Sequence, residues 1–117
     1  MTTNLSRGDI VRVRLSPVEG SEQAGERPAL VLSPDVINKY SPVILVAAIT
    51  SKKVDRDPFE VLITPPEGGL THTSKILLMH IRSVDKRRLT GFYGRITDET
   101  MRKVEDALKI ATGLVPI

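Results

Sequence analysis

The 117-residue sequence contains no cysteine and no tryptophan, and only two phenylalanines and two tyrosines. The absence of cysteine excludes a disulfide framework and thiolate metal sites, so we expect no zinc, and it fits a reducing compartment. With so few aromatic rings, extensive base stacking of the kind found on single-strand nucleic-acid platforms is not expected either.

Long apolar runs are also missing. The longest mostly apolar stretch, residues 42–49, is far shorter than the roughly 20 residues that a membrane span needs. The first residues lack the basic-then-apolar layout of a secretion signal. The sequence therefore predicts a cytoplasmic protein with no membrane segment.

The composition is that of a folded protein, with 40% hydrophobic and 26% charged residues. Length and composition together predict one domain over residues 1–117. The formal net charge of +3 favours polyanionic partners only weakly. A chain of this length buries only about two-thirds of its unfolded surface, so self-association into a dimer would add useful burial.

Alternating and short apolar runs predict about six strands. In the first, Val11, Val13 and Leu15 fall on one face and Arg12 and Arg14 on the other, as in a half-buried strand. The other runs are rich in β-branched residues and are bounded by turn-forming residues. The strands are predicted at residues 9–15, 28–32, 42–50, 59–63, 76–79 and 90–96, with one helical turn within 35–40 and bends or bulges at Gly91 and Gly94.

The period changes after the last of these strands. Met101, Val104, Leu108 and Ala111 form an apolar stripe at helical spacing, and Thr97 is the predicted N-cap. Closely spaced strands without crossover helices indicate an antiparallel barrel or a strongly curved sheet. The predicted fold class is mainly β with a C-terminal helix.

The polar loop after the first strand carries a longer motif. Residues 20–28 read Gly-Ser-Glu-Gln-Ala-Gly-Glu-Arg-Pro and lead directly into an apolar strand. Four further blocks accompany this motif. In chain order they are Arg-Gly-Asp at 7–9, Ala-Ala-Ile-Thr at 47–50, Ile-Arg-Ser-Val-Asp-Lys-Arg-Arg-Leu at 81–89 and Val-Glu-Asp-Ala-Leu at 104–108. Together they resemble, nearly end to end, the MazF/PemK-type toxins of bacterial type II toxin–antitoxin systems.

This resemblance implies an SH3-like barrel of the MazF/CcdB/Kid type with a C-terminal helix, in a homodimer. It implies an endoribonuclease, or mRNA interferase, that needs no metal or other cofactor and cleaves single-stranded RNA at a short sequence. It also implies inhibition by a cognate MazE-like antitoxin that fills the RNA groove with an acidic tail. Contact with DNA is expected only through the complex with that antitoxin.

The chemistry requires few groups, because RNA carries its own nucleophile in the 2′-hydroxyl. Arg27 is suited to stabilising the phosphorane, since a guanidinium offers two parallel donors and stays charged. Glu22 is the candidate base, with Glu19 as the alternate carboxylate. Thr50 ends the third strand, where its hydroxyl could orient the phosphate for in-line attack. The resemblance places Arg27, Glu22 and Thr50 together.

Candidate RNA contacts are assigned by their location near the matched loops, and a solvated charge cluster is the competing interpretation for the basic ones. They are Ser21, Gln23, Ser51, Lys53, Ser74 and Lys75.

One pair departs from the resemblance. Relatives with the 81–89 block commonly have Glu-Gln before it, where this chain has Met79 and His80. Loss of an acidic acceptor leaves the recognition sequence open. We expect His80 to be a partly buried strand residue.

Two other functions fit the same residues. The chain could belong to the barrel proteins that poison DNA gyrase without cleaving nucleic acid, in which case Arg27 would be dispensable. It could also be a basic SH3-like module that binds nucleic acid without chemistry.

Overall fold

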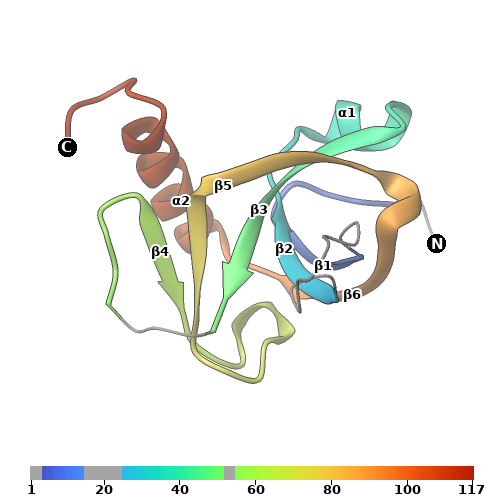
Figure 1. Cartoon of the computed structure of the whole chain (residues 1–117), viewed down its shortest axis with the longest axis horizontal. Helices are drawn as coiled ribbons and strands as arrows, with labels where there is room; N and C mark the ends of the chain where they lie inside the picture. The colour runs from blue at the N-terminus through green and yellow to red at the C-terminus, as the bar shows by residue number, and fades with distance from the viewer. Residues whose placement is uncertain (1–3, 15–24, 52–54) are drawn as a thin grey trace.

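The computed structural model describes residues 4–14, 25–51 and 55–117. Six strands and two α-helices make up most of this part of the chain, with two short 3₁₀ turns between them (Figure 1). In chain order they are β1 (Asp9–Arg14), β2 (Glu26–Val31), α1 (Asp35–Tyr40), β3 (Val43–Thr50), β4 (Glu60–Ile63), η1 (Glu67–Gly69), β5 (Ser74–Asp85), η2 (Lys86–Arg88), β6 (Leu89–Arg95) and α2 (Asp98–Ala111).

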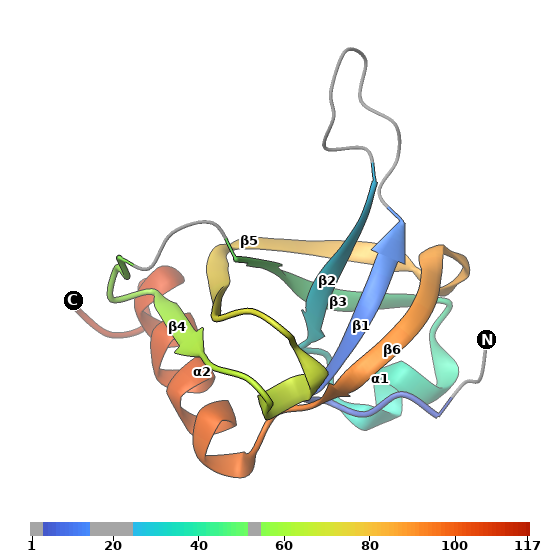
Figure 2. The same ribbon diagram turned by 90° about the horizontal axis from the view of Figure 1, so that it is seen from below.

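All six strands join one antiparallel sheet in the order β4-β5-β3-β2-β1-β6. The sheet is strongly curved, so that β5 and β6 bend around the central strands while α2 lies beside β4 (Figure 2). β4 and β6 form the two edges. The mainly β fold with a C-terminal helix is therefore confirmed, as a barrel-like sheet that does not close fully.

The first half of β1 is buried on both faces of the sheet. Val11 and Val13 pack into one cluster, as their alternation with Arg12 and Arg14 predicts. Ile10 is fully buried on the opposite face, in a second cluster that includes Val104 and Ala107 of α2. Curvature produces this arrangement, because a bent sheet can enclose one core while its helix covers another. The half-buried first strand was thus predicted correctly only for its second half.

β5 is twelve residues long, whereas the sequence predicted a strand only at 76–79. Its pairing with β3 runs from Lys75 to Leu77 and resumes at Ile81, so three residues, 78–80, bulge out of the ladder opposite Ala47 and Ala48. A bulge interrupts the alternation that marks a strand in sequence and bends the strand that carries it. The bend lets the first part of β5 pair with both β4 and the end of β3, while its second part pairs with the start of β3.

Two predicted local features are confirmed. The Thr97 hydroxyl accepts a hydrogen bond of 3.1 Å from the amide of Thr100 and so caps α2. The β1–β6 pairing shifts register on either side of Val11 and Arg12, next to Gly94 and Gly91. The helix and the bulges of β6 therefore lie where the sequence placed them.

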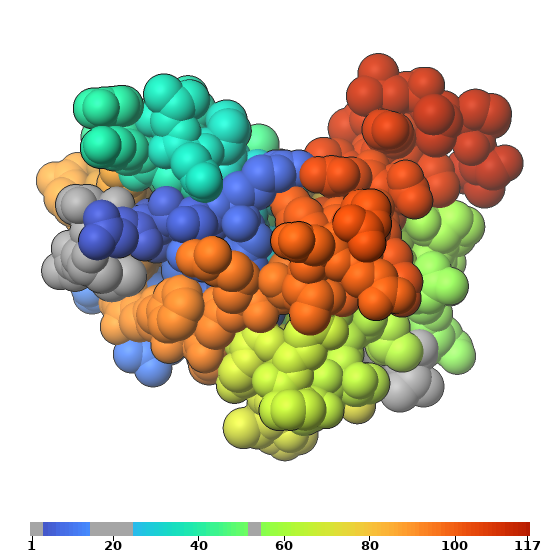
Figure 3. Space-filling model, turned by 180° about the vertical axis from the view of Figure 1, so that it is seen from behind, coloured from blue at the N-terminus to red at the C-terminus, as the bar shows by residue number. Residues whose placement is uncertain are grey.

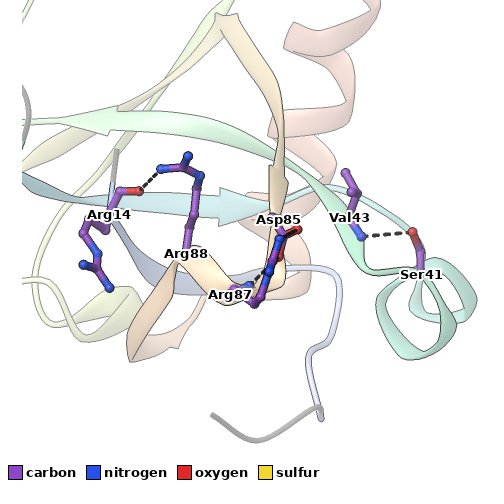
Figure 4. A network of polar contacts seen from close by, with 6 residues as sticks. All are labelled: Arg14, Ser41, Val43, Asp85, Arg87 and Arg88. Atoms are coloured by element: carbon purple, nitrogen blue, oxygen red, sulfur yellow. Dashed lines mark hydrogen bonds and ion pairs between the residues drawn. The ribbon is translucent and has the colours of Figure 1, made fainter. Parts of the chain in front are cut away.

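The turn at η2 connects β5 to β6, and an ion pair between nearby residues stabilises it (Figure 4). Asp85 accepts three hydrogen bonds from Arg87, one from the amide at 2.8 Å and two from the guanidinium at 3.0 and 3.1 Å. These bonds, the side-chain bonds first, hold the pKa of Asp85 below its ordinary value. Arg88 reaches the carbonyl of Arg14 at 3.4 Å and ties the turn to the end of β1.

The face opposite to that of Figure 1 is hollowed between α1 and the C-terminal residues (Figure 3). No helix in the part of the chain that the structure describes is both long enough and apolar enough to cross a membrane.

Candidate active site

Arg27 and Thr50 lie close together at the ends of neighbouring strands. β2 and β3 are paired antiparallel, with Ala29 opposite Ala48. This is the last pair of the two strands, and two residues further on Arg27 pairs with Val13 of β1 and Thr50 with Lys75 of β5. Both side chains are partly exposed, and both line the same two hollows. The position of the pair is therefore set by the sheet itself.

The larger hollow has a volume of about 590 Å³ and apolar walls. Val13, Ala29 and Val46 form part of its floor, and Ile81 and Val84 come from the second half of β5. Its polar rim includes His80 and Arg82, besides Arg27 and Thr50.

The smaller hollow has a volume of about 230 Å³ and lies on the other side of the same pair. Ser51 continues from Thr50, and the segment between η1 and β5 contributes Thr71, His72 and Ser74. Tyr93 of β6 completes it. Arg27, Pro28, Ile49 and Thr50 are common to both hollows and thus form the boundary between them.

Several sequence candidates lie outside the described residues. They are Ser21, Glu22, Gln23 and Lys53, together with the alternate carboxylate Glu19. The roles assigned to them stay predictions.

Two of the remaining candidates are engaged within the protein. Ser74 is 4% exposed, and its hydroxyl donates a hydrogen bond of 2.9 Å to the carbonyl of His72. The Lys75 ammonium donates to the carboxylate of Glu60 at 3.0 Å and to the carbonyl of Asp55 at 2.7 Å. These contacts show both residues holding the adjoining loops, and Lys75 lines neither hollow.

The Glu60 carboxylate is shielded from solvent, with 12% of its side chain exposed. Burial raises the pKa of Glu60, but a hydrogen bond from the Asp57 amide, the hydrogen bond and charge of Lys75 and the charge of His80 outweigh that effect. Its pKa therefore lies below the ordinary value, and the Glu60 carboxylate is ionised at neutral pH.

His80 differs from the prediction. It is exposed rather than partly buried, because it belongs to the bulge of β5 and not to a regular part of the strand. It stands on the rim of the larger hollow, near Arg82.

Arg82, His72 and Tyr93 were not singled out as site residues by sequence. Arg82 sits in the block that resembles the family, which was the available signal. Nothing local in the sequence marks His72 or Tyr93, because the hollow they share is built from segments about 20 residues apart. Among the described residues, no group of three His, Asp or Glu side chains is arranged to hold a metal ion.

The arrangement has known counterparts. Residues 6–112 match the family of PemK-like, MazF-like toxins of type II toxin–antitoxin systems. The chain belongs to this family. It is 44% identical over 112 residues to endoribonuclease EndoA of Bacillus subtilis (strain 168), a match that covers 95% of this chain and 97% of EndoA.

Solved structures of MazF toxins share the fold. The chain is 29% identical to a protein in the MazE–MazF structure (Form-II) from Deinococcus radiodurans, with a TM-score of 0.78 over 96% of this chain and 98% of that one. An endoribonuclease from Mycobacterial species, in complex with its cognate antitoxin, superposes with a TM-score of 0.79 at 24% identity, covering 97% and 99% of the two chains. The second likeness shows the fold alone. The MazF/PemK resemblance of the sequence is thus confirmed along almost the whole chain.

Proposed function

We propose that this endoribonuclease toxin cleaves single-stranded RNA at a short sequence, through attack of the 2′-hydroxyl on the adjacent phosphorus. The 5′-oxygen leaves and takes a proton from solvent water, so the products are a 2′,3′-cyclic phosphate and a 5′-hydroxyl. The observation that carries the proposal is the pairing of Arg27 with Thr50 on the boundary between two hollows. A phosphate held at this boundary has room on each side for a neighbouring nucleoside.

Each group has a distinct task in this reaction. Arg27 stabilises the charge that grows on the phosphorane, because its guanidinium matches two phosphate oxygens and remains protonated. Its very high pKa makes it a poor proton donor. Thr50 orients the phosphate for in-line attack. Glu22 removes the proton from the 2′-hydroxyl. No metal ion is needed, since the nucleophile belongs to the substrate and the positive charge to Arg27.

RNA contacts outside this centre follow from position. Ser51 lines the smaller hollow and is exposed, so it is well placed to bind a phosphate or sugar. Ser21, Gln23 and Lys53 are proposed to contact the strand on either side. Ser74 and Lys75 act mainly by holding the site's loops, and a direct contact by Lys75 would require its ion pair with Glu60 to open.

The partner proteins are proposed from a related complex. A MazF toxin that is 29% identical to this chain has been solved with MazE. We therefore propose that residues 1–117 act as a single toxin domain, in a cytoplasmic homodimer, neutralised by a cognate MazE-like antitoxin. Contact with DNA would occur only through that complex.

The decisive experiment is an incubation of the purified protein with a long, mixed-sequence, unstructured RNA in EDTA. Discrete cuts with cyclic-phosphate and 5′-hydroxyl ends are expected, and they should be abolished by added cognate antitoxin. Retention of RNA without cuts would instead favour a binding module. DNA breaks that require gyrase would favour the gyrase-poison alternative.

A further inference from the structure

The smaller hollow contains an aromatic side chain whose direction is set by a bulge. β6 pairs Phe92 with Val11 and Gly94 with Ile10, so Tyr93 is the extra residue between two successive pairs. Bulges redirect side chains, and they occur frequently next to active sites. Here the effect is that Phe92 and Tyr93 are both exposed, at 58% and 36%, while Tyr93 lines the hollow beside Arg27 and Thr50.

The segment that contains Gly68 and Gly69 contacts the backbone of β6 at Tyr93 and Gly94. A Cβ atom on Gly69 would lie 1.9 Å from the carbonyl oxygen of Tyr93, and one on Gly94 would lie 2.7 Å from the carbonyl carbon of Gly68. Gly68 and Gly69 also have positive φ angles of 69° and 73°. The segment that follows, Leu70 to Ser74, therefore starts from a fixed point on β6.

Polar groups on that segment face the same space. His72 lies within 3.0 Å of the Thr71 hydroxyl through its Nδ1 atom, and both residues are exposed. Ser74 fixes the loop from beneath through its bond to the His72 carbonyl. The hollow thus combines one aromatic ring, one imidazole and hydroxyl groups at its rim, next to the guanidinium of Arg27.

This combination matches what an unpaired nucleobase needs. Single-stranded RNA is bound by stacking splayed bases on aromatic side chains and by hydrogen bonds to their edges. The volume of about 230 Å³ is below the roughly 300–1,000 Å³ of pockets for drug-sized ligands, which suits a single base. The larger hollow has apolar walls and no tyrosine or phenylalanine among its lining residues, and the only ring there besides proline is the imidazole of His80.

We propose that the smaller hollow is a nucleobase subsite for one of the two nucleotides that flank the scissile phosphate, with Tyr93 stacking on the base and His72 binding its edge. Because Arg27 and Thr50 form the boundary of this hollow, a base seated there fixes the register of the phosphate at the cleavage centre. Tyr93 is thus a positioning and specificity residue. This inference rests on the proposed ribonuclease function.

The test compares variants on a short RNA that contains one mapped cleavage site. Stacking of one base is worth about 5- to 150-fold by alanine substitution, so Tyr93→Ala is expected to lower kcat/KM by that factor, mainly through KM. Tyr93→Phe keeps the ring and should stay near the wild type. The matched control is Phe92→Ala, the neighbouring exposed aromatic that lines neither hollow, and it should change nothing.

A second arm uses substrates in which one flanking nucleotide is replaced by an abasic ribonucleotide, which keeps the 2′-hydroxyl. Wild-type cleavage should fall when the base is missing on one side of the cut, and Tyr93→Ala should then cause no further loss. The inference is overturned if Tyr93→Ala lowers cleavage of intact and abasic substrates by the same factor.

The wild-type measurement keeps the inference testable even if Tyr93→Ala does not fold. Wild-type enzyme that is indifferent to loss of either flanking base would overturn it without any variant. Failure of the proposed function is a separate result, in which the wild-type protein cuts neither intact nor abasic RNA and Arg27→Ala changes nothing.

Discussion

Arg27 and Thr50 each lie two residues beyond Ala29 and Ala48, the last pair of β2 and β3, and both line the boundary between two hollows. The backbone of each residue is held in a strand ladder, Arg27 opposite Val13 of β1 and Thr50 opposite Lys75 of β5. This placement gives the site a guanidinium and a hydroxyl on two held strands, with a cavity on each side, and we propose that they bind the phosphate. Rigid placement of donors is what makes electrostatic stabilisation of a transition state effective.

Removing only the hydroxyl of Thr50 tests its role in orienting the phosphate. Thr50→Val keeps the shape and the β-branched side chain, and it is expected to lower kcat by about tenfold, the size of one hydrogen bond to a charged group. Thr50→Ser retains the hydroxyl and should stay within a few-fold of the wild type. Single-turnover cleavage of a mapped RNA site measures both. Equal rates for Thr50→Val and the wild type would remove Thr50 from the mechanism.

Arg82 is exposed on the rim of the larger hollow, where a cation can contact the RNA backbone. Arg82→Ala should weaken binding to all sequences alike and reduce the slope of log K against log salt by about 1. The control is Arg87→Ala, because the Arg87 side chain is 90% exposed and its guanidinium is paired with Asp85 at the η2 turn. Binding titrations at several salt concentrations distinguish the two. An effect of Arg82→Ala confined to one target sequence would contradict a backbone contact.

The Glu60–Lys75 pair should make stability depend on pH. The pKa of Glu60 is lower in the folded protein than its ordinary value of 4.5, so its contribution is complete above that value and is lost as the pH falls through the lowered pKa. Glu60→Gln is expected to reduce the free energy of unfolding by about 1–2 kcal/mol at pH 7. The difference should shrink in acid, where Glu60 is neutral too. Urea unfolding of both proteins from pH 7 to pH 3 measures it, and a difference that is constant with pH would exclude the ionised pair as its cause.

Gly69 allows η1 to contact β6, and a side chain there should be costly. Gly69→Ala places a Cβ atom 1.9 Å from the Tyr93 carbonyl oxygen at a φ of 73°, and we expect a loss of at least about 3 kcal/mol from strain and displacement. Gly113→Ala is the matched control, because Gly113 has a φ of 79° but no atom within 4 Å of its Cβ position. It should cost only about 1–2 kcal/mol. Equal losses in chemical denaturation would show that the close contact contributes nothing.

Much of the fold could be predicted from local patterns. The apolar stripe and Thr97 cap of α2 depend on neighbours within one turn, so the sequence displays them directly. The length of β5 could not be predicted, because its bulge at residues 78–80 breaks the alternation. The burial of Ile10 on a second face was also missed, since it depends on where the curved sheet carries α2.

Some features of the site were predicted from the sequence, and others depend on the folded structure. Arg27 and Thr50 were predicted to act together from a resemblance, and the structure places both on the lining of the same two hollows. The RNA contact assigned to Lys75 stays a prediction, and its ion pair with Glu60 could not be foreseen because the two meet only when β4 pairs with β5. Tyr93 and His72 could not be paired by any spacing rule, because a bulge and a backbone contact bring them together.

The most direct test is the cleavage rate of Arg27→Ala in EDTA, on an RNA whose cut site has been mapped with the wild-type protein. Loss of one preorganised transition-state donor is expected to lower the rate by about 10²–10³, with unfolding stability and dimerisation unchanged. Cleavage by Arg27→Ala at the wild-type rate and at the same bond would contradict the assignment of this guanidinium to the reacting phosphate.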